Sequence, residues 1–371
     1  MTVQKIDLAG EAPGAVRTLV RHIWGRPGAR PKVYLQAALH ADEMPGVIAL
    51  QYLMDLLDTA EAEGRITGEI SVVPLANPIG FGHWISHKPM GRQDLDSMQN
   101  FNRHYPDLAA LIGDSLDGKL TASADENLTI IRKAMGTAIA KLPIKTDLDA
   151  QRQTLLGWSH DADYVLDCHC DHVAVMHLYA APLRPSDTSL LCRCTGAKLA
   201  LIQEISGGNA FDEVHTVPWA ALKRRYAGRF PIPEGCFSTT LEYRGQFDVD
   251  DESGAQDGAN LLAFLGAVGA VQGTNAPAFE DAPHFPLGGS GEAFAPQGGV
   301  VTWKKQPGDW LTKGEIVAHV TDPMTRLRMP VAAPNDGLLF RIELWRHCLR
   351  GQSLFNVAGK DVLRTGDLLS D

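Results

Sequence analysis

Two residues that can hold a metal ion stand three positions apart early in the chain. His40 and Glu43 lie in residues 39–46, which follow an apolar run and precede a helical pattern. An imidazole nitrogen and a carboxylate oxygen are both zinc ligands, and a catalytic zinc commonly takes three protein ligands plus a water. A tight connection lets both side chains converge on one point. The same pattern is also compatible with an ordinary surface turn.

A third ligand is expected at the end of another strand, and His169 follows an apolar run of that kind. In an extended segment, Cys168 and Cys170 point to one face and His169 to the other, which disfavours a shared thiolate site. We predict that His169 binds the metal and that the cysteines pack as small apolar residues. Asp167 or Asp171 would orient the imidazole. The alternative is a histidine with a purely structural role.

Glu242 ends a further apolar run, at residues 237–241. A carboxylate beside a metal-bound water is the usual general base in hydrolysis. The alternative is a structural ion pair between Glu242 and the nearby Arg244.

A polar segment, residues 91–106, carries Arg92, Asn102 and Arg103 and has no apolar helical face. Arginine side chains recognise carboxylates through two-point contacts, and they stabilise the oxyanions that develop in acyl transfer. These three residues are therefore candidates for substrate binding. By itself, the segment is equally typical of a solvated surface loop.

The elements that must position these residues alternate between strands and helices. We expect strands at residues 33–39, 69–75, 164–169 and 238–242, and helices at residues 45–61, 126–141 and 256–271. Alternation of this kind predicts an α/β domain with a largely parallel or mixed sheet. In open α/β sheets, ligands bind in the crevice at the strand ends, where His40 and His169 are expected.

The character of the sequence changes after residue 271. Residues 272–296 are rich in proline and glycine, which is typical of a connector, and short strands separated by turns follow from residue 297. We therefore predict two domains. Residues 1–285 form the α/β domain, and residues 286–371 form a small all-β domain.

Composition excludes several classes of protein. The 371 residues carry a net charge of −10, whereas nucleic acids and anionic membranes attract basic surfaces, so neither is an expected partner. No run of 18 apolar residues indicates a transmembrane helix, and residues 1–25 lack a signal-peptide layout. The six cysteines include no CxxC pair. We expect a cytoplasmic protein, and we leave open whether it forms a homo-oligomer.

Taken in order, the four segments resemble the succinylglutamate desuccinylase/aspartoacylase family of the zinc carboxypeptidase superfamily. That family shows a His-x-x-Glu motif, an arginine followed by an Asn-Arg pair, a strand-end Asp-x-His and a late glutamate. All of these parts occur here between residues 30 and 275. The run Asn-Phe-Asn-Arg-His-Tyr-Pro at residues 100–106 is similar to the bacterial deacetylase-like branch. The resemblance implies a zinc-carboxypeptidase-like mixed sheet flanked by helices.

The resemblance also implies a zinc-dependent hydrolase that cleaves the amide bond of a small anionic N-acylated amino acid. It implies that one Zn²⁺ ion is bound by His40, Glu43 and His169, and that Glu242 is the general base. It also implies that Arg92 stabilises the oxyanion and that the substrate carboxylate is bound by Asn102 and Arg103. A metallocarboxypeptidase that acts on short peptides would use the same metal site. A non-catalytic metal-binding or ligand-binding protein is the alternative from a different class.

The tail contains Pro-Gly-Asp at residues 307–309, Lys-Gly-Glu at residues 313–315 and Ala-Pro-Asn-Asp-Gly at residues 333–337. Through these motifs it resembles the biotinyl/lipoyl-like barrel-sandwich that often follows this catalytic domain. A carrier domain presents a lysine at its hairpin tip, but the corresponding residues 322–329 contain arginines and no lysine. We therefore predict that covalent biotin and lipoate are excluded. The domain would instead shape the mouth of the active site or form an oligomer contact.

Overall fold

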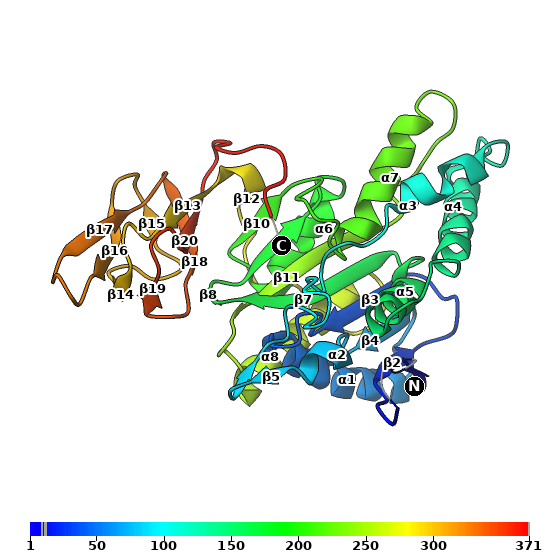
Figure 1. Cartoon of the computed structure of the whole chain (residues 1–371). Helices are drawn as coiled ribbons and strands as arrows, with labels where there is room; N and C mark the ends of the chain where they lie inside the picture. Colours follow the sequence, from blue (N-terminus) through cyan, green and yellow to red (C-terminus); the bar gives the residue numbers. More distant parts are fainter. Residues whose placement is uncertain (9, 11–12, 370–371) are drawn as a thin grey trace.

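A nine-stranded mixed sheet forms the centre of the computed structural model, which describes residues 1–8, 10 and 13–369 (Figure 1). Its strands are β1 (Thr2–Asp7), β2 (Thr18–Trp24), β3 (Lys32–Ala37), β4 (Glu69–Val73), β7 (Tyr164–Asp171), β9 (His177–Ala180), β10 (Leu199–Ile202), β11 (Phe237–Gly245) and β12 (His284–Pro286). They lie in the order β1-β2-β4-β3-β7-β11-β9-β10-β12. The central neighbours β4, β3, β7 and β11 run parallel to one another.

Helices cover both faces of this sheet (Figure 1). One face packs against α1 (Pro45–Ala62), α6 (Pro185–Thr195) and α8 (Asp251–Ala267), and the other against α3 (Leu108–Ile112), α4 (Ala124–Ile139), α5 (Asp147–Ser159) and α7 (Glu213–Arg225). Three short helices, α2 (Pro78–Phe81), η1 (Gly113–Leu116) and η2 (Leu287–Gly289), lie in connections. Among the described residues, none of the helices combines the length and apolar character that a membrane crossing requires.

The central strand β3 is buried along its whole length because helices cover both of its faces. Val33 and Leu35 pack into the core beneath α1, and Tyr34 between them packs into the opposite core. Helix α1 approaches this part of the sheet closely at Gly46, where an added Cβ would lie 2.8 Å from the Cβ of Cys168. This close contact fixes the start of α1 against the end of β7.

The eight C-terminal strands form two antiparallel sheets of four strands each, one of which gains a fifth strand from the first part of the chain, and they share a hydrophobic core of their own. We call residues 290–358 the C-terminal β-region. Its strands are β13 (Ser290–Phe294), β14 (Gly299–Trp303), β15 (Trp310–Leu311), β16 (Ile316–Thr321), β17 (Arg328–Ala332), β18 (Gly337–Ile342), β19 (His347–Cys348) and β20 (Ser353–Ala358). A short strand that follows β7, β8 (Val173–Ala174), pairs with β18. A further two-stranded ribbon is formed by β5 (Trp84–Ile85) and β6 (Lys88–Pro89).

Two predicted elements differ from the structure. The prediction that residues 272–296 form a connector is wrong for the last part of this range. Strands β12 and β13 both lie there, and β12 joins the large sheet beside β10. Helix α8 begins at Asp251, five residues before the predicted start at residue 256, because the Asp250 side chain caps it by accepting a hydrogen bond from the Ser253 amide. The domain boundary near residue 285 stays a prediction.

Candidate metal centre

Three neighbouring parallel strands bring the candidate residues to one edge of the sheet. After β3, Ala38 takes a left-handed conformation (φ 55°) that turns the chain toward His40. His169 lies near the end of β7, and Glu242 on β11 is its register partner. The carboxyl ends of parallel strands meet at one edge, so residues that are 200 positions apart in the sequence become neighbours.

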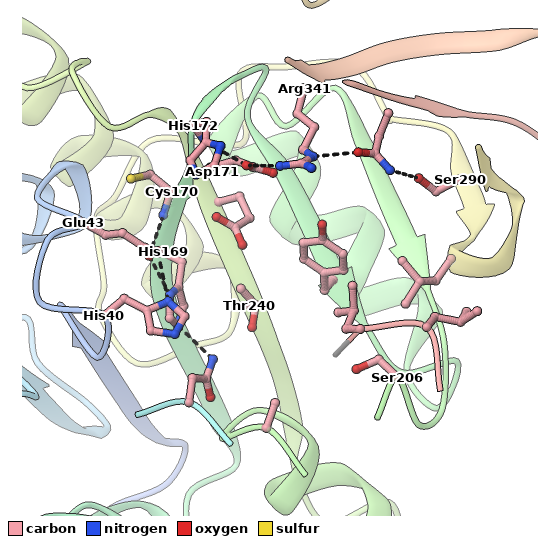
Figure 2. Close-up of a pocket in the computed structure, with 18 of the residues that line it drawn as sticks. His40, Glu43, His169, Cys170, Asp171, His172, Ser206, Thr240, Ser290 and Arg341 are labelled. Atoms are coloured by element: carbon pink, nitrogen blue, oxygen red, sulfur yellow. Dashed lines mark hydrogen bonds and ion pairs between the residues drawn. The ribbon is translucent and has the colours of Figure 1, made fainter. Parts of the chain in front are cut away.

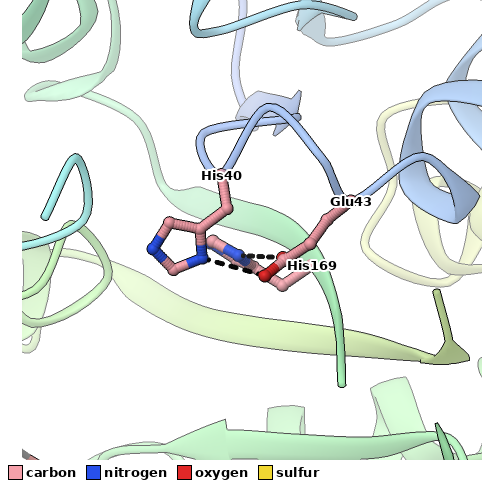
Figure 3. A group of neighbouring side chains, drawn as sticks. All are labelled: His40, Glu43 and His169. Carbon is pink, nitrogen blue, oxygen red and sulfur yellow. Dashed lines mark hydrogen bonds and ion pairs between the residues drawn. The ribbon is translucent and has the colours of Figure 1, made fainter. Parts of the chain in front are cut away.

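Figure 3 shows His40, Glu43 and His169 converging on one point. The Nδ1 atom of His40 lies 3.0 Å from Oε1 of Glu43, and the Nδ1 atom of His169 lies 2.8 Å from Oε2 of the same carboxylate. One ligand atom from each residue falls within 4.8 Å of the others. All three side chains are buried. The arrangement therefore brings together the three predicted ligands.

The outward nitrogen of each imidazole faces an oxygen. Nε2 of His40 lies 2.9 Å from Oδ1 of Asn100, and Nε2 of His169 lies 3.0 Å from Oδ2 of Asp167. Oxygen acceptors at these positions favour a proton on Nε2 and leave Nδ1 free to bind a metal. This donor set fits a zinc ion. Of the two predicted orienting residues, Asp167 has this role, whereas Asp171 turns away to Arg341.

The protonation states of the cluster suit a cation. Burial acts to raise the pKa of Glu43, but His40 and His169 outweigh it and hold this pKa well below its usual value. Burial, assisted by Arg92, lowers the pKa of His40 to about 4, so its imidazole is neutral. At His169, burial acts to lower the pKa, but Asp167 and Glu43 raise it well above the usual value. The two carboxylates thus favour a positive charge, which a bound metal ion would supply.

Gly91 packs against the loop that carries His40 and Glu43, and its carbonyl oxygen accepts a hydrogen bond of 2.9 Å from the Ala41 amide. An added Cβ would lie 2.4 Å from the backbone nitrogen of Asp42. We expect Gly91→Ala to displace this loop, to reduce zinc affinity about tenfold and to lower the free energy of unfolding by about 1–3 kcal/mol. Zinc titration and denaturant unfolding measure the two effects.

Gly157 provides the matched control, because it lies inside α5 and an added Cβ there meets no atom within 4 Å. Gly157→Ala should leave zinc affinity unchanged and should stabilise the fold by about 0.5–1 kcal/mol. Equal zinc affinity in Gly91→Ala and the parent chain would contradict the supporting role of Gly91.

The metal cluster opens into a cavity of about 600 Å³. Figure 2 shows His40, Glu43 and His169 on one side of this cavity and Arg341 and Ser290 across from them. The predicted residues Arg92, Asn102, Arg103 and Glu242 also line it. The structure therefore brings all seven predicted site residues to one cavity.

Glu242 faces the cavity with one carboxylate oxygen, Oε2, that is buried and has no hydrogen-bond partner among the described residues. Burial raises its pKa well above the usual value, and the charges of Glu43 and Asp171 add to this rise. The alternative of a pair with Arg244 is wrong, because Arg244 binds both carboxylate oxygens of Asp257. Oε2 of Glu242 is thus free of any structural partner in the described part of the chain.

The polar segment around residues 91–106 is not a solvated loop at its end, because Asn102 and Arg103 are 5% and 6% exposed. The Asn102 Oδ1 atom accepts a hydrogen bond of 2.8 Å from the Phe211 amide, and Nη1 of Arg103 donates to the Asn102 carbonyl at 2.7 Å. Arg92 keeps an exposed side chain, and its Nη1 lies 3.5 Å from Oε1 of Glu43. Arg92 therefore lies beside the metal cluster, and the other two are held in the wall.

Several residues of the cavity were not predicted from the sequence. Arg341 of β18 donates a hydrogen bond of 3.1 Å to Asp171 and another of 2.7 Å to Asn356 of β20. Tyr179 of β9 and Asp212, just before α7, line other parts of the wall. No local pattern distinguishes these residues, since they reach the cavity only through the packing of distant elements.

Comparisons with known proteins find one matching family model and several solved structures with the same fold. Residues 29–134 match the model of the succinylglutamate desuccinylase/aspartoacylase catalytic domain. No curated protein matches the chain. Among solved structures, a protein described as a member of that family from Shewanella amazonensis has a TM-score of 0.85 at 23% identity, covering 97% of this chain and 99% of its own. A protein of the same description from Shewanella frigidimarina has a TM-score of 0.83 at 23% identity, covering 96% of each chain.

The ectoine utilization protein of Ruegeria pomeroyi, solved with bound product, has a TM-score of 0.64 at 18% identity and covers 96% of this chain and 95% of its own. At these identities the solved structures establish the fold, which extends over nearly the whole chain. The deacetylase-like branch stays a prediction. Residues 29–134 thus match the catalytic-domain model of the succinylglutamate desuccinylase/aspartoacylase family, as the order of the motifs predicted.

Proposed function

We propose that this chain is a zinc-dependent hydrolase that cleaves the amide bond of a small N-acylated amino acid. One observation carries the proposal. The cluster of His40, Glu43 and His169 opens on the same cavity as the unpartnered Glu242 carboxylate and the buried Arg103. The family assignment supports a hydrolase that acts on N-acyl amino acids.

Each part of the cavity has a role in this proposal. A zinc ion held by the three ligands would supply Lewis-acid activation of water and of the substrate carbonyl near neutral pH. Glu242 accepts a proton from the attacking water and returns it to the leaving amine. Arg92 stabilises the negative charge that develops on the carbonyl oxygen. Asn102 and Arg103 bind the substrate carboxylate, which places the scissile amide beside the metal cluster.

The C-terminal β-region contributes to the proposed substrate cavity. Ser290, Glu292, Phe340 and Arg341 form part of its wall. Leu368 and Leu369 also line it, and their amides donate hydrogen bonds of 2.7 and 2.9 Å to the Ser206 carbonyl. These contacts support the prediction that the region shapes the mouth of the site. Walls on this side limit substrate length, which favours an acyl amino acid over a peptide.

A substrate screen tests the proposal. Zinc-loaded protein is incubated with N-acetyl and N-succinyl amino acids and with dipeptides and tripeptides, and the released amine is quantified. We expect cleavage of acyl amino acids with kcat/KM at least about 100-fold above that of any peptide, since the reacting carbonyl must sit at the metal cluster. The reverse preference would indicate a metallocarboxypeptidase. A chain that binds neither zinc nor substrate would instead support the non-catalytic alternative.

The remaining expectations about partners are part of the same proposal. The substrate carries a carboxylate that Arg92 and Arg103 attract, and neither a nucleic acid nor a membrane is a partner. A cytoplasmic location and the oligomeric state also stay predictions.

A further inference from the structure

A small side cavity of about 20 Å³ adjoins the metal cavity. Tyr179, Ser206, Asp212 and Leu287 line both spaces. A volume of this size accommodates about one water-sized group. Only a compact end of a ligand can therefore enter it from the metal cavity.

The side cavity is acidic. Besides Asp212, it is lined by Glu204 and Glu213. Glu204 is neutralised by Arg224, whose Nη1 lies 2.6 Å away. Glu213 is 8% exposed and receives a hydrogen bond from the Ser206 amide on Oε1 only, so its buried Oε2 has no partner among the described residues.

Asp212 lines both cavities, and its carboxylate interacts electrostatically with the acidic Glu213 and Asp167, while His169 and Arg103 act in the opposite direction. Burial and the neighbouring Glu213 raise the pKa of Asp212 to about 7. A cation placed beside the two carboxylates would offset both effects and favour the charged form. A buried carboxylate pair of this kind is costly unless a positively charged ligand balances it.

The side cavity also lies next to the residues proposed to bind the substrate carboxylate. Phe211, which precedes Asp212, donates its amide proton to Asn102. In the same segment, an added Cβ at Gly208 would lie 2.4 Å from Cδ of Arg103, so this backbone packs directly on the arginine. In an amino acid, the side chain and the carboxylate leave the same Cα. A substrate held at Asn102 and Arg103 would therefore present its side chain toward Asp212.

We infer that the side cavity receives the ammonium group at the end of the substrate's side chain, and that the enzyme prefers Nα-acyl derivatives of basic amino acids. This inference rests on the proposed function. An ammonium group has the size of a water and would be balanced by Asp212 and Glu213. A side-chain carboxylate, as in glutamate or aspartate, would face two carboxylates at this position and be repelled.

The test compares side chains that differ in charge but not in shape. Zinc-loaded full-length protein is assayed with Nα-acetyl-ornithine, with the neutral isostere N-acetyl-norleucine, and with N-acetyl-glutamate. The corresponding lysine and shorter diamino acid derivatives, each with its own isostere, cover other side-chain lengths. We expect kcat/KM of the best cationic substrate to be at least about tenfold higher than that of its neutral isostere. Its advantage over the glutamate derivative should be larger still.

Asp212→Asn keeps the shape of the side chain and removes its charge. It should bring the ratio of cationic to isosteric kcat/KM close to one. Asp114→Asn is the matched control, since it makes the same chemical change at an exposed carboxylate that lines neither cavity and lies 2.9 Å from Nη2 of Arg225. This control should retain the preference of the parent chain.

The outcomes separate the two proposals. Failure to cleave any N-acyl amino acid would overturn the proposed function itself. Cleavage of the neutral isosteres as fast as of the cationic substrates would overturn the inference and leave the function intact. A faster reaction with norleucine on addition of potassium ions would place a free cation in the side cavity, and would also overturn the inference.

Discussion

Glu242→Gln is expected to lower kcat for amide hydrolysis by about 10³-fold while the metal content of the protein stays unchanged. Removal of a general base typically costs about 10²–10⁴-fold in rate. Glutamine keeps the shape of the side chain, and Oε2 of Glu242 makes no hydrogen bond to the described residues that the change could break. The stability of the variant should therefore match that of the parent. Steady-state kinetics together with metal analysis measure the effect.

Glu234→Gln is the matched control for this experiment, because Glu234 lies outside the cavity and pairs with Lys223 at 3.0 Å. Its kcat should remain within about threefold of the parent value, as is usual for changes that leave the reacting atoms untouched. If Glu242→Gln retained full activity with zinc bound, Glu242 would not be the general base.

Removal of zinc with a chelator is expected to abolish hydrolysis and to destabilise the protein, and added zinc should restore both. A ligand that binds only the folded state at about 1,000 times its Kd stabilises that state by about 4.1 kcal/mol.

His169→Ala removes one ligand and should abolish this zinc-dependent stabilisation. Asp167→Asn leaves the three ligands in place and should weaken zinc binding about 10- to 100-fold. Unfolding curves with and without zinc measure the shift.

His172→Gln is the matched control for the metal experiments. This histidine lies three residues beyond His169 and contacts Glu343 of the C-terminal β-region, outside the metal cluster. The variant should keep the full zinc-dependent shift. If His169→Ala kept that shift as well, the metal would bind elsewhere.

The metal cluster could be predicted from the sequence because its geometry follows from strand ends. The apolar runs before His40 and His169 mark buried parallel strands, and such strands end at a common edge. Neighbouring side chains in β7 point to opposite faces of the sheet, so His169 could be distinguished as a ligand from Cys168, which packs in the core beneath α1. Local patterns were sufficient here since each strand carries its own ligand.

Other parts of the site depend on contacts that no local pattern encodes. Arg341 meets Asp171 across 170 positions of sequence, and the preference of Arg244 for Asp257 over Glu242 depends on where α8 packs. The connector prediction was wrong because proline and glycine also occur in short strands such as β12, whose pairing partner β10 lies far away in the sequence. The acidic stretch before α8 similarly concealed the helix cap at Asp250.

The pairing of β8 with β18 has a consequence for how this protein can change during evolution. Arg341, with a side chain 20% exposed, balances Asp171, which lies two residues after His169 on the strand that leads into β8. Loss of one partner from a fully buried pair costs about 3–5 kcal/mol, and the cost for this partly buried pair is smaller. A deletion of the C-terminal β-region would thus strip both a pairing strand and a counter-charge from the end of β7. A shortened descendant would have to acquire a neutral residue at position 171 before it could lose the C-terminal β-region.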